Sequence, residues 1–301
     1  MALRFAVASQ DFGGHLKRSI AAAGRTGVSG VRLDARKEIR VDDFTDTALR
    51  QLRLSIEKSQ MQAAGLMFST RHALCDPEYF DQRVDGIRRA MPLARKLGTD
   101  EMLIRVGRVP DPSAEDVAKD TESESNQDVD SLSNPFSFVT SAGKDRPMSE
   151  ADQFRMLVEL LNDLAAHGNH VGCRLQLQLA AYDVSRVRQL IRNVKAGPVG
   201  IVFDPATCVM TGRNPTQIYR DLHDMVGYIR CRDALRDVDG AGIECTVGQG
   251  IVDWPELLAT IAEASYTGWC CIERTGGDDR PVDVVSGVKY FRDMLPGAIA
   301  G

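Results

Sequence analysis

Eight short β-rich runs alternate with longer amphipathic segments along this chain, and this alternation restricts its fold more than any other feature. The runs contain no proline, as strands in the middle of a sheet require. Several of the helical segments open with residues that favour helix starts, such as Asp76, Ser149 and Asp253. The pattern predicts strands at residues 4–8, 30–34, 63–69, 102–106, 173–179, 199–204, 228–232 and 269–273.

Eight strand-then-helix rounds in 301 residues fit a closed (β/α)₈ TIM barrel better than an open doubly wound sheet, which usually has fewer strands. No GxGxxG sequence follows the first run, which also weakens the nucleotide-binding alternative. A barrel of this length forms one hydrophobic core, so we expect a single domain over residues 1–301.

One segment interrupts the alternation after the fourth run. Residues 111–146 are polar and acidic, as in DTESESNQDVDSLSN, with an apolar patch only at 135–139. An insertion at this place lies on the side of the barrel where active sites form. The sequence leaves two alternatives open: a mobile loop, or a lid that docks through Phe136 and Phe138.

Charge and composition exclude some classes of partner. The formal net charge is −5 and the pI is about 5.6, so no basic surface is expected to bind nucleic acid. No segment approaches about 18 uninterrupted apolar residues, and residues 1–10 do not resemble a secretory signal. The seven cysteines form no CxxC pair and suit a reduced core. We expect a cytoplasmic protein with no membrane partner.

The alternation within each strand sorts its side chains between the two faces. In the sixth run Ile201 and Phe203 are suited to face the helices, so Asp204 points into the barrel at the end of its strand. Taken singly, Arg32 and Arg105 could close salt bridges at the barrel floor. The whole inward set predicts a polar ligand site; it comprises Arg32, Asp34, Arg105, Gln176, Gln178, Asp204, Arg230, Arg232 and Glu273.

The last three strand regions carry the most specific motifs. The segments VGIVFDPATCVMTG, GYIRCRDA and VGQGIVDWPELLATIAEASYTGWCCIE resemble strands six to eight of the xylose-isomerase-like barrels. That group includes sugar epimerases, inosose dehydratases and, more distantly, endonuclease IV. LRFAVASQDF and GRTGVSGVRLDAR are similar to its first two strands, so the resemblance covers nearly the whole chain except the acidic insertion.

In that family a divalent metal is held by Glu, Asp, His and Glu on strands five to eight. These positions fall on Gln178, Asp204, Arg230 and Glu273, of which only Asp204 and Glu273 match. A further family histidine falls on Thr207. Because a protonated arginine has no lone pair to give, the first expectation is that no metal binds. If Mn, Mg or Zn does bind, it would use Gln178, Asp204 and Glu273.

The resemblance also implies a reaction. Family members remove a proton next to a carbonyl with one Glu and return it with the other. Gln178 cannot accept a proton, so the expected catalytic residues are Glu273 as base, Asp204 as its helper and Arg230 as the group that stabilises negative charge. We expect a sugar isomerase or epimerase acting on a small sugar, polyol or sugar acid. A dehydratase and an inactive or metal-free sugar-binding protein stay open as alternatives.

Other positions are expected to contact that substrate. Asp233 matches the Asp of the family's HxKDA pattern, and Arg232 stands at its Lys. His72, in STRHALCDP, is either a proton shuttle or an exposed loop residue. The expected substrate-binding set is Gln178, Gln176, Arg105, Arg232, Asp233, His72 and Asp34. For a homo-oligomer the candidate surfaces are 136–139 and the helix near Tyr290, Phe291 and Met294.

Overall fold

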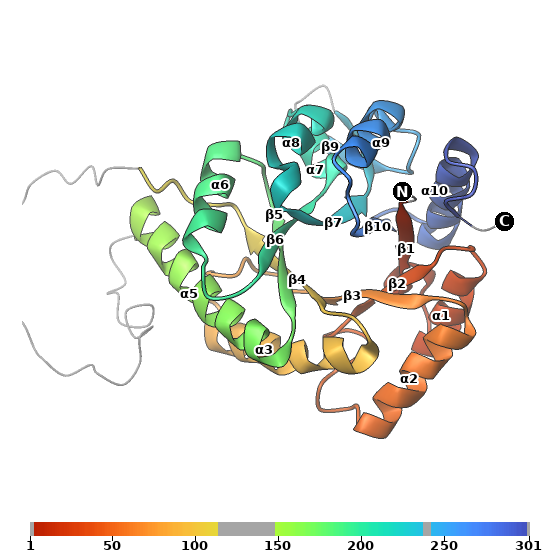
Figure 1. The fold of residues 1–301 in the computed structure, drawn as a ribbon, viewed down its shortest axis with the longest axis horizontal. Coiled ribbons are helices and arrows are strands. Elements are labelled where there is room, and N and C mark those ends of the chain that lie inside the picture. Colours follow the sequence, from red (N-terminus) through yellow and green to blue (C-terminus); the bar gives the residue numbers. More distant parts are fainter. Residues whose placement is uncertain (1–2, 114–147, 237–241, 300–301) are drawn as a thin grey trace, which may run out of the picture.

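The computed structural model describes residues 3–113, 148–236 and 242–299, and within them eight parallel strands close into a barrel with helices outside it (Figure 1). This confirms the TIM barrel that the alternation predicts. Around the barrel the strands are β1 (Arg4–Ala8), β10 (Trp269–Ile272), β7 (Val226–Cys231), β6 (Val199–Phe203), β5 (Arg174–Leu179), β4 (Glu101–Gly107), β3 (Gln62–Phe68) and β2 (Gly30–Asp34).

The helices follow the strands in chain order. They are α1 (Leu16–Gly24), α2 (Asp46–Lys58), α3 (Phe80–Leu97), α5 (Glu150–Val171), α6 (Val184–Asn193), α7 (Pro205–Met210), α8 (Pro215–Leu222), α9 (Trp254–Glu263) and α10 (Arg280–Met294), with 3₁₀ turns η1 (Ser9–Phe12) and η2 (His223–Met225). Ser149 and Asp253 cap α5 and α9 as expected. Asp76 instead accepts the N–H of Glu78 in a turn, and α3 begins later, at Phe80.

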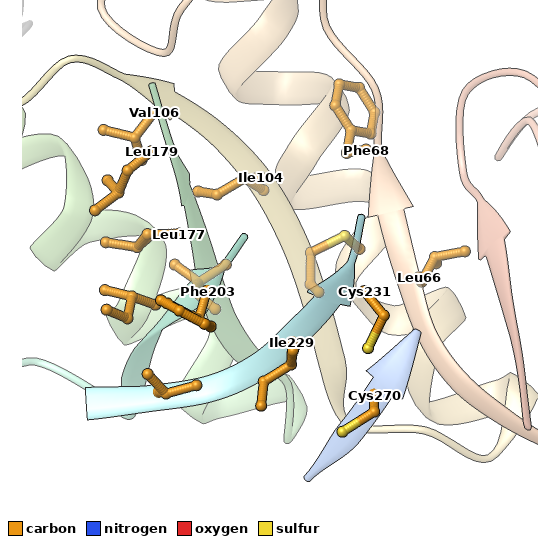
Figure 2. Close-up of a cluster of buried hydrophobic side chains, with 14 of the residues drawn as sticks. Leu66, Phe68, Ile104, Val106, Leu177, Leu179, Phe203, Ile229, Cys231 and Cys270 are labelled. Carbon is orange, nitrogen blue, oxygen red and sulfur yellow. The ribbon is translucent and has the colours of Figure 1, made fainter. Parts of the chain in front are cut away.

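Two apolar layers hold the barrel together. The helix-facing side chains of the strands, such as Leu177 and Phe203, are fully buried against the helices (Figure 2). The interior has a smaller core, and its members include Ala6, Leu103 and Val202. The expected assignment of Ile201 and Phe203 to the outer face agrees with this packing, and it places Asp204 on the inner face.

A two-stranded antiparallel hairpin, which the sequence analysis did not predict, follows β7. Its strands are β8 (Asp233–Arg236) and β9 (Gly242–Cys245). The hairpin continues from the C-terminal end of a barrel strand, the end at which TIM barrels form their active sites. It therefore adds side chains to the mouth of the barrel.

The structure bears on three further expectations. No helix in the described ranges is long and apolar enough to cross a membrane. The insertion at 111–146, with Phe136 and Phe138, lies outside the described residues except for 111–113. Phe291, named as an oligomer surface, is fully buried and packs against Phe5 and Trp254, so it cannot contact another chain.

Candidate active site

The ends of β2, β6, β7 and β10 bring a group of buried charges together at the mouth. Asp204 directly follows β6, Glu273 directly follows β10, and Arg230 lies near the end of β7. Each is 5% exposed or less, and the sequence analysis placed all three on the inner face. Asp204 also caps α7 by accepting the N–H of Thr207, which fixes its carboxylate.

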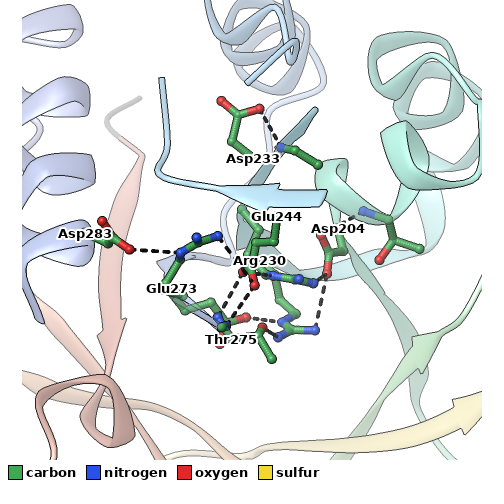
Figure 3. Close-up of polar contacts among 12 residues, drawn as sticks. Asp204, Arg230, Asp233, Glu244, Glu273, Thr275 and Asp283 are labelled. Atoms are coloured by element: carbon green, nitrogen blue, oxygen red, sulfur yellow. Dashed lines mark hydrogen bonds and ion pairs between the residues drawn. The ribbon is translucent and has the colours of Figure 1, made fainter. Parts of the chain in front are cut away.

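The Arg230 guanidinium lies between the two acids (Figure 3). Its Nε donates to Glu273 Oε1, and its Nη1 donates to Asp204 Oδ2 at 3.2 Å. Nη2 lies 3.5 Å from the hydroxyl of Thr275. All three nitrogens of the guanidinium therefore have partners, and the two carboxylates share one cation.

A second arginine extends the network toward the hairpin. Arg232 Nη1 donates to Asp204 Oδ2 at 2.7 Å, and its Nε donates to Glu244 Oε1 at 2.7 Å. Glu244 comes from β9 and also accepts the backbone N–H groups of Thr275 and Gly276. Sequence reasoning missed Glu244 because its strand was not predicted. The hairpin thus connects β7 to the loop after β10 through Glu244.

Glu273 is bound on both oxygens. Arg230 holds Oε1 and Arg32 holds Oε2. Burial would raise the pKa of Glu273, but the charges of Arg230 and Arg32 outweigh burial and hold this pKa at about 2. Glu273 is therefore ionised at neutral pH and weakly basic, which counts against the expected role as the base.

Asp11, in the 3₁₀ turn after β1, is a mouth carboxyl that the sequence analysis did not single out. It is 5% exposed; Oδ2 accepts the backbone N–H of Arg274 at 3.0 Å, and Oδ1 lies 3.6 Å from Arg280 Nη1. Burial and the nearby charge of Glu273 raise the pKa of Asp11 to about 7. The sequence feature that could have identified Asp11 as a site residue is its position, three residues after the first strand.

Asp11→Asn is expected to change how stability depends on pH. The pKa of Asp11 is about 7 in the folded state against an ordinary value of 3.8, so the folded protein binds its proton more tightly and loses stability as pH rises from about 4 to about 7. Asparagine has no proton to lose there. Thermal unfolding at pH 4, 6 and 8 should show a higher midpoint for the variant at pH 8 and a smaller difference at pH 4. Parallel curves for the two proteins would contradict the raised pKa.

Two of the expected substrate-binding residues, Arg105 and Gln178, face the mouth and have no side-chain partner among the described residues. Arg105 on β4 is exposed, and its Nη1 donates only to the backbone carbonyl of Arg71, at 3.1 Å. No carboxylate in the described ranges pairs with Arg105. Gln178 is its register partner on β5, and its side chain makes no hydrogen bond within the described part of the chain. Within the described part of the chain, the amide of Gln178 and the remaining N–H groups of Arg105 have no hydrogen-bond partner.

The remaining candidates lie apart from this cluster. Gln176 lies deeper in the barrel and donates to Glu101 at 2.6 Å.

Asp34 accepts the N–H groups of Arg36 and Lys37 and the hydroxyl of Ser69, so it holds a turn. Asp233 accepts three backbone N–H groups and the indole N–H of Trp254. His72 lies in the loop after β3, beside Asp76. Asp34 and Asp233 have both oxygens occupied by protein donors.

The cluster does not fit the divalent metal that the family resemblance implies. A metal ion held by Asp204 and Glu273 would have to lie where the Arg230 guanidinium bonds to both. That guanidinium is a permanent cation with no lone pair, and Gln178 contributes no charge. The positive charge between Asp204 and Glu273 therefore comes from the Arg230 side chain.

Known proteins resemble the chain along most of its length. A family model described as a xylose isomerase-like TIM barrel matches residues 20–294. Inosose dehydratase of Lacticaseibacillus casei is 21% identical over 147 residues, which cover 43% of this chain and 49% of that protein. The chain thus spans about half the length of this curated relative.

Solved structures share the whole fold. A xylose isomerase domain protein from Planctomyces limnophilus has a TM-score of 0.74 and 21% identity, with 99% of this chain and 98% of that chain covered. The 3-keto-D-glucoside 4-epimerase from E. coli has a TM-score of 0.68 and 14% identity, with 97% and 99% covered. The family match covers most of the chain, and the closed barrel and these likenesses agree with it, so the chain belongs to the xylose isomerase-like TIM barrel family.

Proposed function

We propose that this barrel binds a small sugar acid or a related polyhydroxylated anion and moves a proton next to its carbonyl group without a resident divalent metal between Asp204 and Glu273. The observation that carries the proposal is the Arg230 guanidinium bonded to both acids. A buried, permanent cation can offset the charge of the two acids, as a metal does in the family. Relatives named as a dehydratase and as an epimerase fit a reaction that begins with such a proton transfer.

An anionic substrate is favoured by Arg105 and Gln178 at the mouth. The charge of Arg105 has no carboxylate partner among the described residues, and the amide of Gln178 lies beside it. An arginine with free N–H groups binds a carboxylate or phosphate through paired, charge-assisted hydrogen bonds. A neutral sugar would leave that charge unpaired. We therefore assign the anionic end of the substrate to Arg105.

The proton acceptor in this proposal is Asp11. Asp11 and Glu273 are two buried carboxyls whose pKa values move in opposite directions, to about 7 and to about 2. Such a pair suits separate roles, with one group exchanging a proton near neutral pH and the other staying ionised. The proton leaves the carbon beside the carbonyl for the Asp11 carboxylate, and the electron pair moves to the carbonyl oxygen. Glu273 then keeps Arg230 and Arg32 in place.

The expected result is deuterium incorporation into an anionic substrate. A panel of keto sugars, inositol-derived ketones and their acid analogues would be incubated with the protein in D₂O, and the proton next to the carbonyl followed by NMR. We expect exchange in an acid member of the panel, about 10²–10⁴-fold slower in Asp11→Asn because a general base is lost. Arg105→Gln should weaken binding of the same compound at least about tenfold.

Arg155→Gln is the matched control, because Arg155 is an exposed arginine on α5 whose side chain is 73% accessible. It should leave binding and exchange unchanged. A preference of the unsubstituted protein for neutral sugars would contradict the role given to Arg105.

A sugar-binding protein without catalysis is the second candidate. The observation that favours it is that both Glu273 oxygens are held by arginines, which leaves the family's usual base inactive. Saturable binding of a panel member with no exchange of any of its protons would select this candidate. Exchange that depends on Asp11 would exclude it.

A further inference from the structure

A second cluster of metal-binding side chains lies in the loop that joins β3 to α3. His72 Nδ1 lies 3.2 Å from Asp76 Oδ2, and its Nε2 lies 3.6 Å from Glu78 Oε2. Taking one possible ligand atom each from His72, Asp76 and Glu78, all three atoms lie within 4.8 Å of one another. An imidazole and two carboxylates form a donor set that first-row divalent metals bind.

The loop holds these side chains from behind. Arg83, which is 6% exposed, donates from both terminal nitrogens to the backbone carbonyls of Asp76 and Glu78, at 2.7–3.1 Å. Asp76 Oδ1 accepts the backbone N–H of Glu78 at 2.9 Å, which turns Oδ2 toward His72. The hydroxyl of Thr70 donates to the carbonyl of His72 at 2.8 Å. Outer hydrogen bonds of this kind orient the ligands of metal sites.

The cluster opens into a pocket. His72 and Glu78 line a hollow of about 420 Å³ together with residues of the β3 end and of α3, including Phe68 and Gln82. The side chains of His72, Asp76 and Glu78 are 30%, 35% and 58% accessible. Three ligands on one side of an ion and solvent on the other leave an open position, as in catalytic rather than structural zinc sites.

Charged neighbours decide which ions can bind. Arg36, Arg71 and Arg83 also line the pocket. The guanidinium of Arg83 bonds to backbone carbonyls, and Arg36 Nη1 donates to the carbonyl of Ser69. Their charges disfavour weakly held cations such as Mg²⁺ but leave a site for an ion that bonds strongly to imidazole. They also favour an anion at the open position of the ion.

We propose that His72, Asp76 and Glu78 bind one divalent transition metal ion of the Zn²⁺ type at the rim of the barrel mouth. The site is separate from the Asp204, Arg230 and Glu273 cluster, so it does not depend on the proposed function. Arg105, which donates to the carbonyl of Arg71, connects the loop of this site to the β4 strand at the mouth.

The test is a titration of the full chain with Zn²⁺, followed by calorimetry, and with Co²⁺, followed by its visible absorption. We expect about one ion per chain, with binding weakened at least about tenfold in His72→Ala and in Asp76→Asn. His170→Ala is the matched control, because His170 is exposed at the C-terminal end of α5. It should bind as the unsubstituted protein does, and circular dichroism should show all variants folded.

Two results would overturn the proposal. One is the absence of stoichiometric Zn²⁺ or Co²⁺ binding to the unsubstituted chain. The other is binding that is equally strong in His72→Ala and His170→Ala, which would locate the ion elsewhere. Neither result bears on sugar binding or proton exchange, so failure here leaves the proposed function to be judged by its own experiment.

Discussion

Glu273→Gln is expected to lower the free energy of unfolding at neutral pH by about 3–5 kcal/mol, the usual cost of removing one partner of a buried ion pair. The substitution leaves Arg32 and Arg230 charged and buried, with 6% of each side chain accessible. The glutamine oxygen can accept from one guanidinium, but its amino group then faces the donors of the other. Urea unfolding of the two proteins at pH 7 measures the difference.

Glu256→Gln is the control for this variant. Glu256 pairs with Arg220 at 3.0 Å, but about half of each side chain is accessible, so its loss should cost under about 1 kcal/mol. The pKa of Glu273 is about 2 when folded against an ordinary value of 4.5, so its contribution is present above pH 4.5 and is lost as pH falls toward 2. Equal destabilisation by the two variants would contradict the buried network.

Gln178→Glu combined with Arg230→His is expected to make the stability of the barrel depend on metal. The two changes restore the family's ligand pattern while removing the cation that separates Asp204 from Glu273. Without metal, repulsion among three carboxylates should lower the unfolding midpoint; with Mn²⁺ or Zn²⁺, binding to the folded state should raise it. Thermal unfolding with and without each ion measures the effect.

This comparison is best made in a His72→Ala background, so that an ion at the rim does not contribute. The His72→Ala protein that keeps Gln178 and Arg230 should show no rise in its unfolding midpoint when either ion is added. An equal rise in this protein and in the one that also carries Gln178→Glu and Arg230→His would show that Arg230 is not the group that excludes the ion.

The sequence was sufficient to predict the barrel and the inner face of its strands. When helices cover one face of a strand with alternating polarity, the apolar side chains must face the helices and the polar ones the barrel interior. Residues such as Ile201 and Phe203 face outward, so Asp204, Arg230 and Glu273 were expected to face inward. The family resemblance correctly predicted the barrel, because its motifs lie on the strands that build it.

Pairing and protonation could not be predicted in the same way. Whether an inward arginine meets a carboxylate depends on register and depth. Arg105 and Arg230 both face inward, yet within the described residues Arg105 donates only to the backbone carbonyl of Arg71, whereas Arg230 bonds to both Asp204 and Glu273. Glu244 joins the network only because a hairpin folds over the mouth. The pKa of Asp11 is raised by burial and by the charge of Glu273, which lies more than 260 residues away in the chain, so no local sequence pattern contains this effect.

We propose that Arg230 takes the place of the family's metal between Asp204 and Glu273. A Mn²⁺ and Zn²⁺ titration tests this proposal on two proteins: His72→Ala alone, and His72→Ala that also carries Gln178→Glu and Arg230→His. We predict no saturable binding in the first and about one ion per chain in the second. About one tightly bound ion per chain in the first protein would contradict this proposal and would support a metal-assisted reaction in this barrel.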